Sequence, residues 1–189
     1  MKTDLHMHSK FSDGKQWPEE IVALAKTMNF EMLALTDHDT MAGVKRFLKA
    51  CSKHGIKGIP AVEIDYDVKQ IHYNSELLGY FPEGKYAMTH AILNDLQNMR
   101  RTIAIEAISI VAIEHKRNDL SFNDLLRHKL NEPLLNPEDL NISITKPICI
   151  IISLIKILQL DMLKKIIQPL KRNSLIVLFL PKSAVQNQD

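Results

Sequence analysis

Three short apolar segments near the start of the chain each run into side chains that commonly bind metal ions. Residues 2–8 read Lys-Thr-Asp-Leu-His-Met-His, residues 32–35 are followed by Asp-His-Asp at 37–39, and residues 56–62 are followed by Glu63. Helical patterns separate these segments. The alternation predicts parallel strands joined by crossover helices, which places the polar groups together at the carboxyl ends of the strands.

The first segment predicts a strand with two different faces. Because side chains alternate along a strand, Asp4, His6 and His8 share one face, and Leu5 and Met7 share the other. We expect the polar face to bind an ion and the apolar face to enter the core.

The two helical patterns carry recognisable boundaries. Pro18 and the two glutamates after it open a helix over residues 18–28, and Thr40 can cap the next helix, which Gly55 ends. Residues 76–81 predict a fourth strand.

The chain changes character after Gly84. All six glycines lie at or before this residue, and the later part has long helical patterns at 88–117 and 145–160 and a strand-like segment at 174–180. The β-branched residues at 148–157 leave a strand possible within the second helical pattern. We therefore expect three parts: residues 1–84, 85–170 and 171–189.

The composition is typical of a folded protein without a strongly charged partner. The 189 residues are 46% hydrophobic and carry a net charge of +2, so nothing favours a nucleic-acid groove or a membrane surface, although nucleic acid is not excluded as a substrate. Cys51 and Cys149 lack CxxC spacing, which favours a reducing compartment. The polar N-terminus is unlike a signal peptide, and we expect a cytoplasmic protein.

The candidate ligands combine imidazole and carboxylate groups without thiolate, and they are His6, His8, Asp13, His38 and Glu63. This set favours Zn, Mn or Fe in a catalytic centre over a structural zinc site. Glu63 is the best candidate to bridge two ions, an arrangement that suits in-line phosphoryl displacement.

Three further aspartates flank these ligands. Asp4 is placed to orient a ligand ring from behind. We expect Asp37 and Asp39 to act with Glu63 in catalysis, although Asp39 could instead orient His38 or cap the following helix.

Four sequences within residues 3–81 closely resemble, in order and spacing, the PHP family (polymerase and histidinol phosphatase domain) of metal-dependent phosphoesterases. They are Asp-Leu-His-Met-His-Ser-x-x-Ser-Asp-Gly, Ala-Leu-Thr-Asp-His-Asp-Thr, Ile-Pro-Ala-Val-Glu-Ile and Leu-Leu-Gly-Tyr. The resemblance implies an irregular β/α barrel with two or three metal ions and a helical insertion after Gly84. By position, it implies that His6, His8 and Glu63 hold one ion. Glu63 would then bridge to a second ion, and Asp13 with His38 would hold a third.

Several positions depart from the family pattern. Glu76 stands where relatives have a ligand histidine, and His72 is its alternative; Leu180 and Ile148 stand at two other histidine positions, and the closing Asp-x-His motif is missing. The resemblance therefore implies an incomplete barrel, arising from truncation, from a partner chain or from a decayed copy.

The leading hypothesis is a PHP-type phosphoesterase, weakened by the missing ligands, that acts on a small phosphorylated substrate, a nucleotide or an oligonucleotide end. The alternative is a non-catalytic metal-binding or interaction remnant, and a third reading is hydrolysis of a C–N bond. We expect no membrane partner, and a homo-oligomer would cover the open edge of the barrel.

Overall fold

The structure is a computed structural model that describes residues 1–68, 73–114, 116–117, 120–130 and 142. In chain order its elements are β1 (Thr3–Met7), α1 (Pro18–Thr27), β2 (Met32–Leu35), α2 (Val44–His54), β3 (Lys57–Val68), β4 (Tyr73–Tyr80), α3 (Ala87–Glu114) and α4 (Phe122–Leu130). The expected mixed α/β class is confirmed. The helix predicted at 145–160 and the strand at 174–180 lie outside the described residues.

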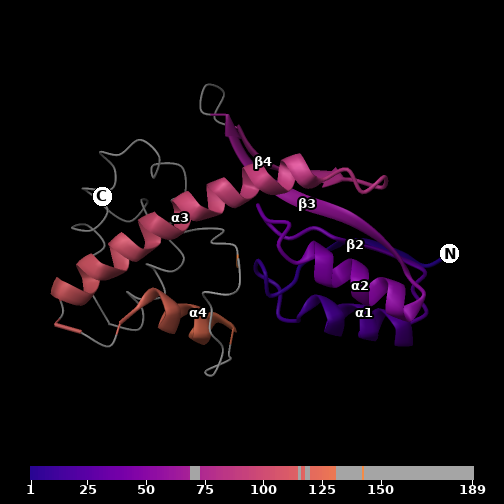
Figure 1. The fold of residues 1–189 in the computed structure, drawn as a ribbon, viewed down its shortest axis with the longest axis horizontal. Helices are drawn as coiled ribbons and strands as arrows, with labels where there is room; N and C mark the ends of the chain where they lie inside the picture. Colours follow the sequence, from indigo (N-terminus) through magenta and orange to yellow (C-terminus); the bar gives the residue numbers. More distant parts are fainter. Residues whose placement is uncertain (69–72, 115, 118–119, 131–141, 143–189) are drawn as a thin grey trace, which may run out of the picture.

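The four strands form one sheet in the order β1-β2-β3-β4. The first three strands are parallel, as the alternation with helices predicts, and β4 returns antiparallel to β3. In Figure 1, α1 and α2 lie side by side along the same side of the strands. The carboxyl ends of β1 and β2 therefore meet at one edge, beside the middle of β3.

β3 continues beyond the end predicted for it. The sequence places Glu63 after the strand, but β3 runs to Val68, so Glu63 lies within it. The prediction was wrong because β4 pairs with β3 as far as Val68 and so extends it well past Pro60, the last residue paired with β2.

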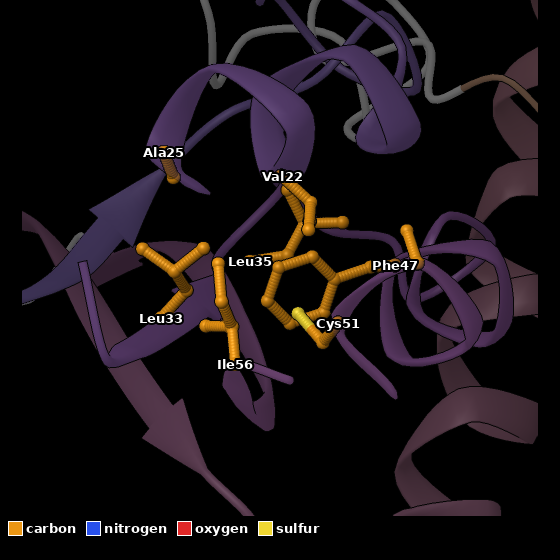
Figure 2. Close-up of a cluster of buried hydrophobic side chains, with 8 residues drawn as sticks. Val22, Ala25, Leu33, Leu35, Phe47, Cys51 and Ile56 are labelled. Carbon is orange, nitrogen blue, oxygen red and sulfur yellow. The ribbon is translucent and has the colours of Figure 1, made fainter. Parts of the chain in front are cut away.

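The main core lies between the sheet and the first two helices. Figure 2 shows Phe47 and Cys51 of α2 packed with Val22 of α1 and with Leu33 and Leu35 of β2. Met7 of β1 also packs against this cluster, as predicted. Leu5 was also predicted to face the core, and this was wrong, since its side chain is 37% exposed.

The long helix α3 packs against the sheet and α2 near its start and against α4 near its end. Leu93 packs with Val44 and Val62 in a second cluster. Further along α3, Ile108 belongs to a third cluster with Leu126 of α4. No helix in the described part of the chain is long and apolar enough to cross a membrane.

The boundaries of α2 differ from prediction at one end. Thr40 does not cap the helix, because its hydroxyl accepts a hydrogen bond from Ala42 N in the preceding turn, and α2 begins only at Val44. Gly55 ends the helix as predicted, in the left-handed conformation with φ of 66°.

Candidate metal centre

One carboxylate oxygen lies at the centre of the site. Glu63 Oε2 is 2.9 Å from His6 Nε2, 3.1 Å from His8 Nε2 and 3.6 Å from His38 Nε2. Glu63 is buried, whereas the His6 side chain is 49% exposed. The centre is therefore open to solvent on the side of His6.

Main-chain hydrogen bonds hold the loop after β2 against β3. Asp39 N donates to Glu63 O at 2.7 Å, and Glu63 N donates to Asp37 O at 3.3 Å. His38 and Glu63 form a parallel bridge. This backbone pairing places His38 directly beside Glu63.

Asp13 joins the centre from the loop after β1. Its oxygens lie 3.3 Å from His8 Nδ1 and 3.8 Å from His38 Nε2. The rings of His8 and His38 stack with centroids 4.7 Å apart. All five predicted ligands therefore meet, in two overlapping sets whose ligand atoms lie within 4.8 Å of one another: His6, His8 and Glu63, and His8, Asp13 and His38.

His38 is oriented by a residue that the sequence analysis missed. Its Nδ1 lies 3.0 Å from Asp65 Oδ1, which leaves Nε2 facing Glu63 and Asp13. The hydrogen bond to Asp65 raises the pKa of His38 to about 9 against the opposing effect of burial, and the charges of Asp65, Asp13 and Glu63 add to the rise. The metal-free ring is protonated at neutral pH, so an ion must displace a proton from it.

Asp65 and Glu76 face each other across the β3–β4 pair. Their ligand atoms and one of His38 lie within 4.8 Å of one another. Directly opposed carboxylates repel, and a bound cation relieves that repulsion. Glu76 thus lies beside the predicted ligands, while His72 lies outside the described residues. The signal for Asp65 was the alternation of side chains along a strand, which places it on the face of Glu63.

Asp37 lies in the loop after β2, next to the candidate ligand His38. It is buried, and its oxygens accept hydrogen bonds from Ser9 N at 2.6 Å, Ser9 Oγ at 2.7 Å and Ser12 Oγ at 2.6 Å. Burial raises the pKa of Asp37, and the serine hydrogen bonds oppose the rise. The structure therefore places Asp37 where it holds the loop between His8 and Asp13.

Asp39 and Asp4 also contact groups other than ligand rings. Asp39 is buried, with Oδ2 2.7 Å from Arg100 Nη1 of α3. Burial raises the pKa of Asp39, and the Arg100 guanidinium opposes the rise. Asp4 accepts a hydrogen bond from the backbone N–H of His6 at 3.2 Å, so it supports the strand at that ligand.

The residues at the centre fit a divalent metal ion. Imidazole and carboxylate are ligands of Zn, Mn and Fe, and both occur in each overlapping set. His8 Nδ1 is buried and makes no hydrogen bond within the described part of the chain, although it lies close to Asp13. A buried polar atom without a hydrogen-bond partner is unusual, and a metal ion would satisfy it.

Comparison with sequence families gives a match over most of the described chain. The PHP domain model matches residues 4–136. A 5'-3' exoribonuclease of Haemophilus influenzae is 35% identical over 107 residues, which are 56% of this chain and 38% of the relative. A 3',5'-nucleoside bisphosphate phosphatase of Chromobacterium violaceum is 39% identical over 61 residues, 32% of this chain and 21% of the relative. This chain thus spans well under half the length of either relative.

Two solved structures share the fold. A protein of Bifidobacterium adolescentis described as a metal-dependent phosphoesterase has a TM-score of 0.54 and 21% identity, over 75% of this chain and 46% of that one. An amidohydrolase of Chromobacterium violaceum has a TM-score of 0.55 and 24% identity, over 81% of this chain and 50% of that one. At these identities the likeness establishes the fold alone.

Proposed function

Because the chain belongs to the PHP domain family, we propose that it is a metal-dependent hydrolase that cleaves a phosphate ester of a nucleotide or of an oligonucleotide end. The observation that carries the proposal is the convergence of three imidazole nitrogens on Glu63 Oε2. The relatives named as an exoribonuclease and a nucleoside bisphosphate phosphatase support this substrate class.

We assign the residues of the centre to two tasks. His6, His8 and Glu63 would hold one ion, Asp13 and His38 another, and Glu76 would add a carboxylate beside His38. When bound, such ions stabilise negative charge on a phosphoryl group and lower the pKa of water. Asp37 and Asp39 keep the ligand loops in place, since their oxygens already accept hydrogen bonds from the protein.

Several finer expectations belong to the same proposal. We expect two or three ions of Mn, Zn or Fe and a cytoplasmic location, and a second copy of the chain would cover the open sheet edge. We place α3 and α4 in an insertion spanning residues 85–170, followed by a last barrel strand within 171–189. The residues that decide this division lie largely outside the described part of the chain.

The test is hydrolysis of p-nitrophenyl phosphate with added Mn²⁺, alongside elemental analysis of the purified chain. We expect hydrolysis that EDTA abolishes and that His8→Ala and Glu63→Ala reduce at least a hundredfold, with loss of bound metal and unchanged helical content. The matched control is His54→Ala, in the last turn of α2, which should retain both metal and activity. Activity insensitive to both EDTA and His8→Ala would overturn the catalytic proposal.

A substrate panel then separates the remaining readings. It contains a nucleoside 3',5'-bisphosphate, a 5'-phosphorylated oligoribonucleotide and an amide. Cleavage of either phosphate ester supports the proposal, whereas cleavage of the amide alone favours C–N hydrolysis. Metal binding without hydrolysis of any substrate favours the non-catalytic alternative. The weak activity expected from Leu180 and the missing closing motif stays a prediction, since Leu180 lies outside the described residues.

A further inference from the structure

Asp39, next to the ligand His38, is held by two side chains from a helix far along the sequence. Its Oδ2 accepts a hydrogen bond from Arg100 Nη1 at 2.7 Å, and its carbonyl accepts one from Gln97 Nε2 at 3.0 Å. Asp39 is fully buried, and Arg100 and Gln97 are nearly so. The contact therefore forms inside the protein, where water has little access to take the place of either partner.

Asp39 also stands in a strained backbone conformation. Its φ is 51°, in the left-handed region that residues other than glycine rarely adopt. Such strain persists only where the surrounding contacts hold it. The contacts from α3 to both the carboxylate and the carbonyl of Asp39 supply that constraint.

Asp39 also forms hydrogen bonds with residues of β3 at the metal centre. Its second oxygen, Oδ1, accepts a hydrogen bond from Asp65 N at 3.1 Å, and its own N–H donates to Glu63 O at 2.7 Å. The Asp65 carboxylate in turn lies 3.0 Å from His38 Nδ1. A continuous series of hydrogen bonds thus leads from Arg100 through Asp39 and Asp65 to the imidazole of His38.

We propose that Arg100 is a positioning residue of the metal centre, which acts through Asp39 and Asp65 to fix the ring of His38. Through its bond to Asp39, Arg100 determines how well the loop after β2 presents His38 to an ion. The proposal rests on the function proposed above. It assigns α3 a role at the centre that none of the metal-binding motifs contains.

The test compares Arg100→Met with Arg101→Met, the neighbouring arginine on α3, whose guanidinium lies over the Phe122 ring instead. Mn²⁺ binding is titrated calorimetrically, and Co²⁺ is titrated by its visible absorption. Removing a residue that orients a metal ligand typically weakens metal binding about 10- to 100-fold. We expect that loss in Arg100→Met for the ion position that contains His38, and less than a threefold change in Arg101→Met.

A double variant separates positioning from simple loss of stability. Arg100→Met alone leaves the Asp39 charge buried without its partner, which destabilises the fold. Asp39→Asn combined with Arg100→Met removes that charge, so its thermal stability should recover towards that of the wild type. Metal affinity should nevertheless stay at least tenfold below wild type, because the orientation of Asp65 and His38 is lost. Wild-type affinity in the double variant would overturn the proposal, as would wild-type affinity in a folded Arg100→Met.

Two further measurements make the result decisive. Arg100→Lys keeps the charge but not the guanidinium geometry, so we expect partial retention of metal affinity. The ¹⁵N resonances of the His38 ring in the metal-free protein should shift in Arg100→Met and not in Arg101→Met. If the wild type binds Mn²⁺ as expected but hydrolyses nothing, the proposed function fails and the positioning role stands. If the wild type binds no metal, both fail.

Discussion

The hydroxyl of Tyr80 donates a hydrogen bond of 2.9 Å to the backbone carbonyl of Leu5, although β4 and β1 are the two outer strands of the sheet that the described residues form. A side chain can bridge outer strands only if the sheet curls strongly about the face that carries Glu63. Tyr80 stands on that face, since it pairs with Ala61, two residues before Glu63. The bond therefore helps to bring His6 of β1 within reach of β3.

We expect Tyr80→Phe to lower the free energy of unfolding by about 0.5–1 kcal/mol, because one partly exposed hydrogen bond is lost and water can replace it. The ring and its packing remain. Urea denaturation measures the change. Tyr86→Phe, whose ring packs edge-on against Phe81, is the control and should alter stability little. Equal effects in both variants would mean that the bond to Leu5 contributes nothing.

Gly14 is required by a close approach of the backbone in the ligand loop. A Cβ at this position would lie 2.2 Å from the carbonyl oxygen of His8, so Gly14→Ala must displace the segment between His8 and Asp13. We expect a loss of stability of about 1–3 kcal/mol, typical of overpacking, together with reduced metal content by elemental analysis. Gly79→Ala is the control, since its Cβ would meet Val62 at an ordinary 3.5 Å. Full metal content in Gly14→Ala would show that the loop tolerates the shift.

Ser12 holds the buried Asp37 carboxylate through a hydrogen bond of 2.6 Å. Hydrogen bonds to charged groups are worth about 1.5–3 kcal/mol, so Ser12→Ala should destabilise the protein by about this amount and weaken binding of metal at Asp13. Thermal denaturation with and without Mn²⁺ measures both effects. Ser52→Ala, at an exposed position of α2, should be neutral. If Ser12→Ala changes neither stability nor metal binding, the hydrogen bonds from Ser9 alone would be sufficient to hold Asp37.

The buried thiol of Cys51 gives a pH-dependent prediction. Burial raises its pKa from an ordinary 9.0 to about 12, so the folded protein keeps a proton that the unfolded chain loses between these values. The contribution of this thiol to stability is therefore complete below pH 9 and is lost as the pH rises from 9 to 12. In a Cys149→Ser background, iodoacetamide at pH 8 should alkylate Cys51 slowly in buffer and rapidly in urea. Rapid alkylation of the folded chain would show that the thiol is accessible.

The sequence was sufficient to predict which side chains meet at the candidate centre, because they follow apolar strands whose order determines where the strand ends meet. His6, His8 and His38 lie where that logic puts them, and helices α1 and α2 begin or end at proline and glycine as expected. The position of Glu63 within β3 could not be predicted from local pattern. It depends on pairing with β4, whose antiparallel direction is a property of the folded sheet.

The supporting residues were harder to predict, because nothing in their own sequence marks them. Arg100 and Gln97 occur in a helical pattern and resemble solvent-exposed polar residues. Their role follows from contacts with Asp39 across 61 and 58 positions of sequence. The same holds for Asp37. Its sequence context matches that of a reactive carboxylate, whereas the hydrogen bonds that it accepts from Ser9 hold the loop after β1 in place.

The long sequence separation between Asp39 and Arg100 has a consequence for synthesis on the ribosome. At about 5–20 residues per second, translation adds Arg100 roughly 3–12 s after Asp39. The chain holds all three imidazoles from the start of that interval and gains Glu63 within it, while the carboxylate of Asp39 beside His38 lacks its counter-ion until Arg100 is added. If Arg100 positions His38 as proposed above, the metal loop of the first eighty residues is completed only after α3 has been synthesised.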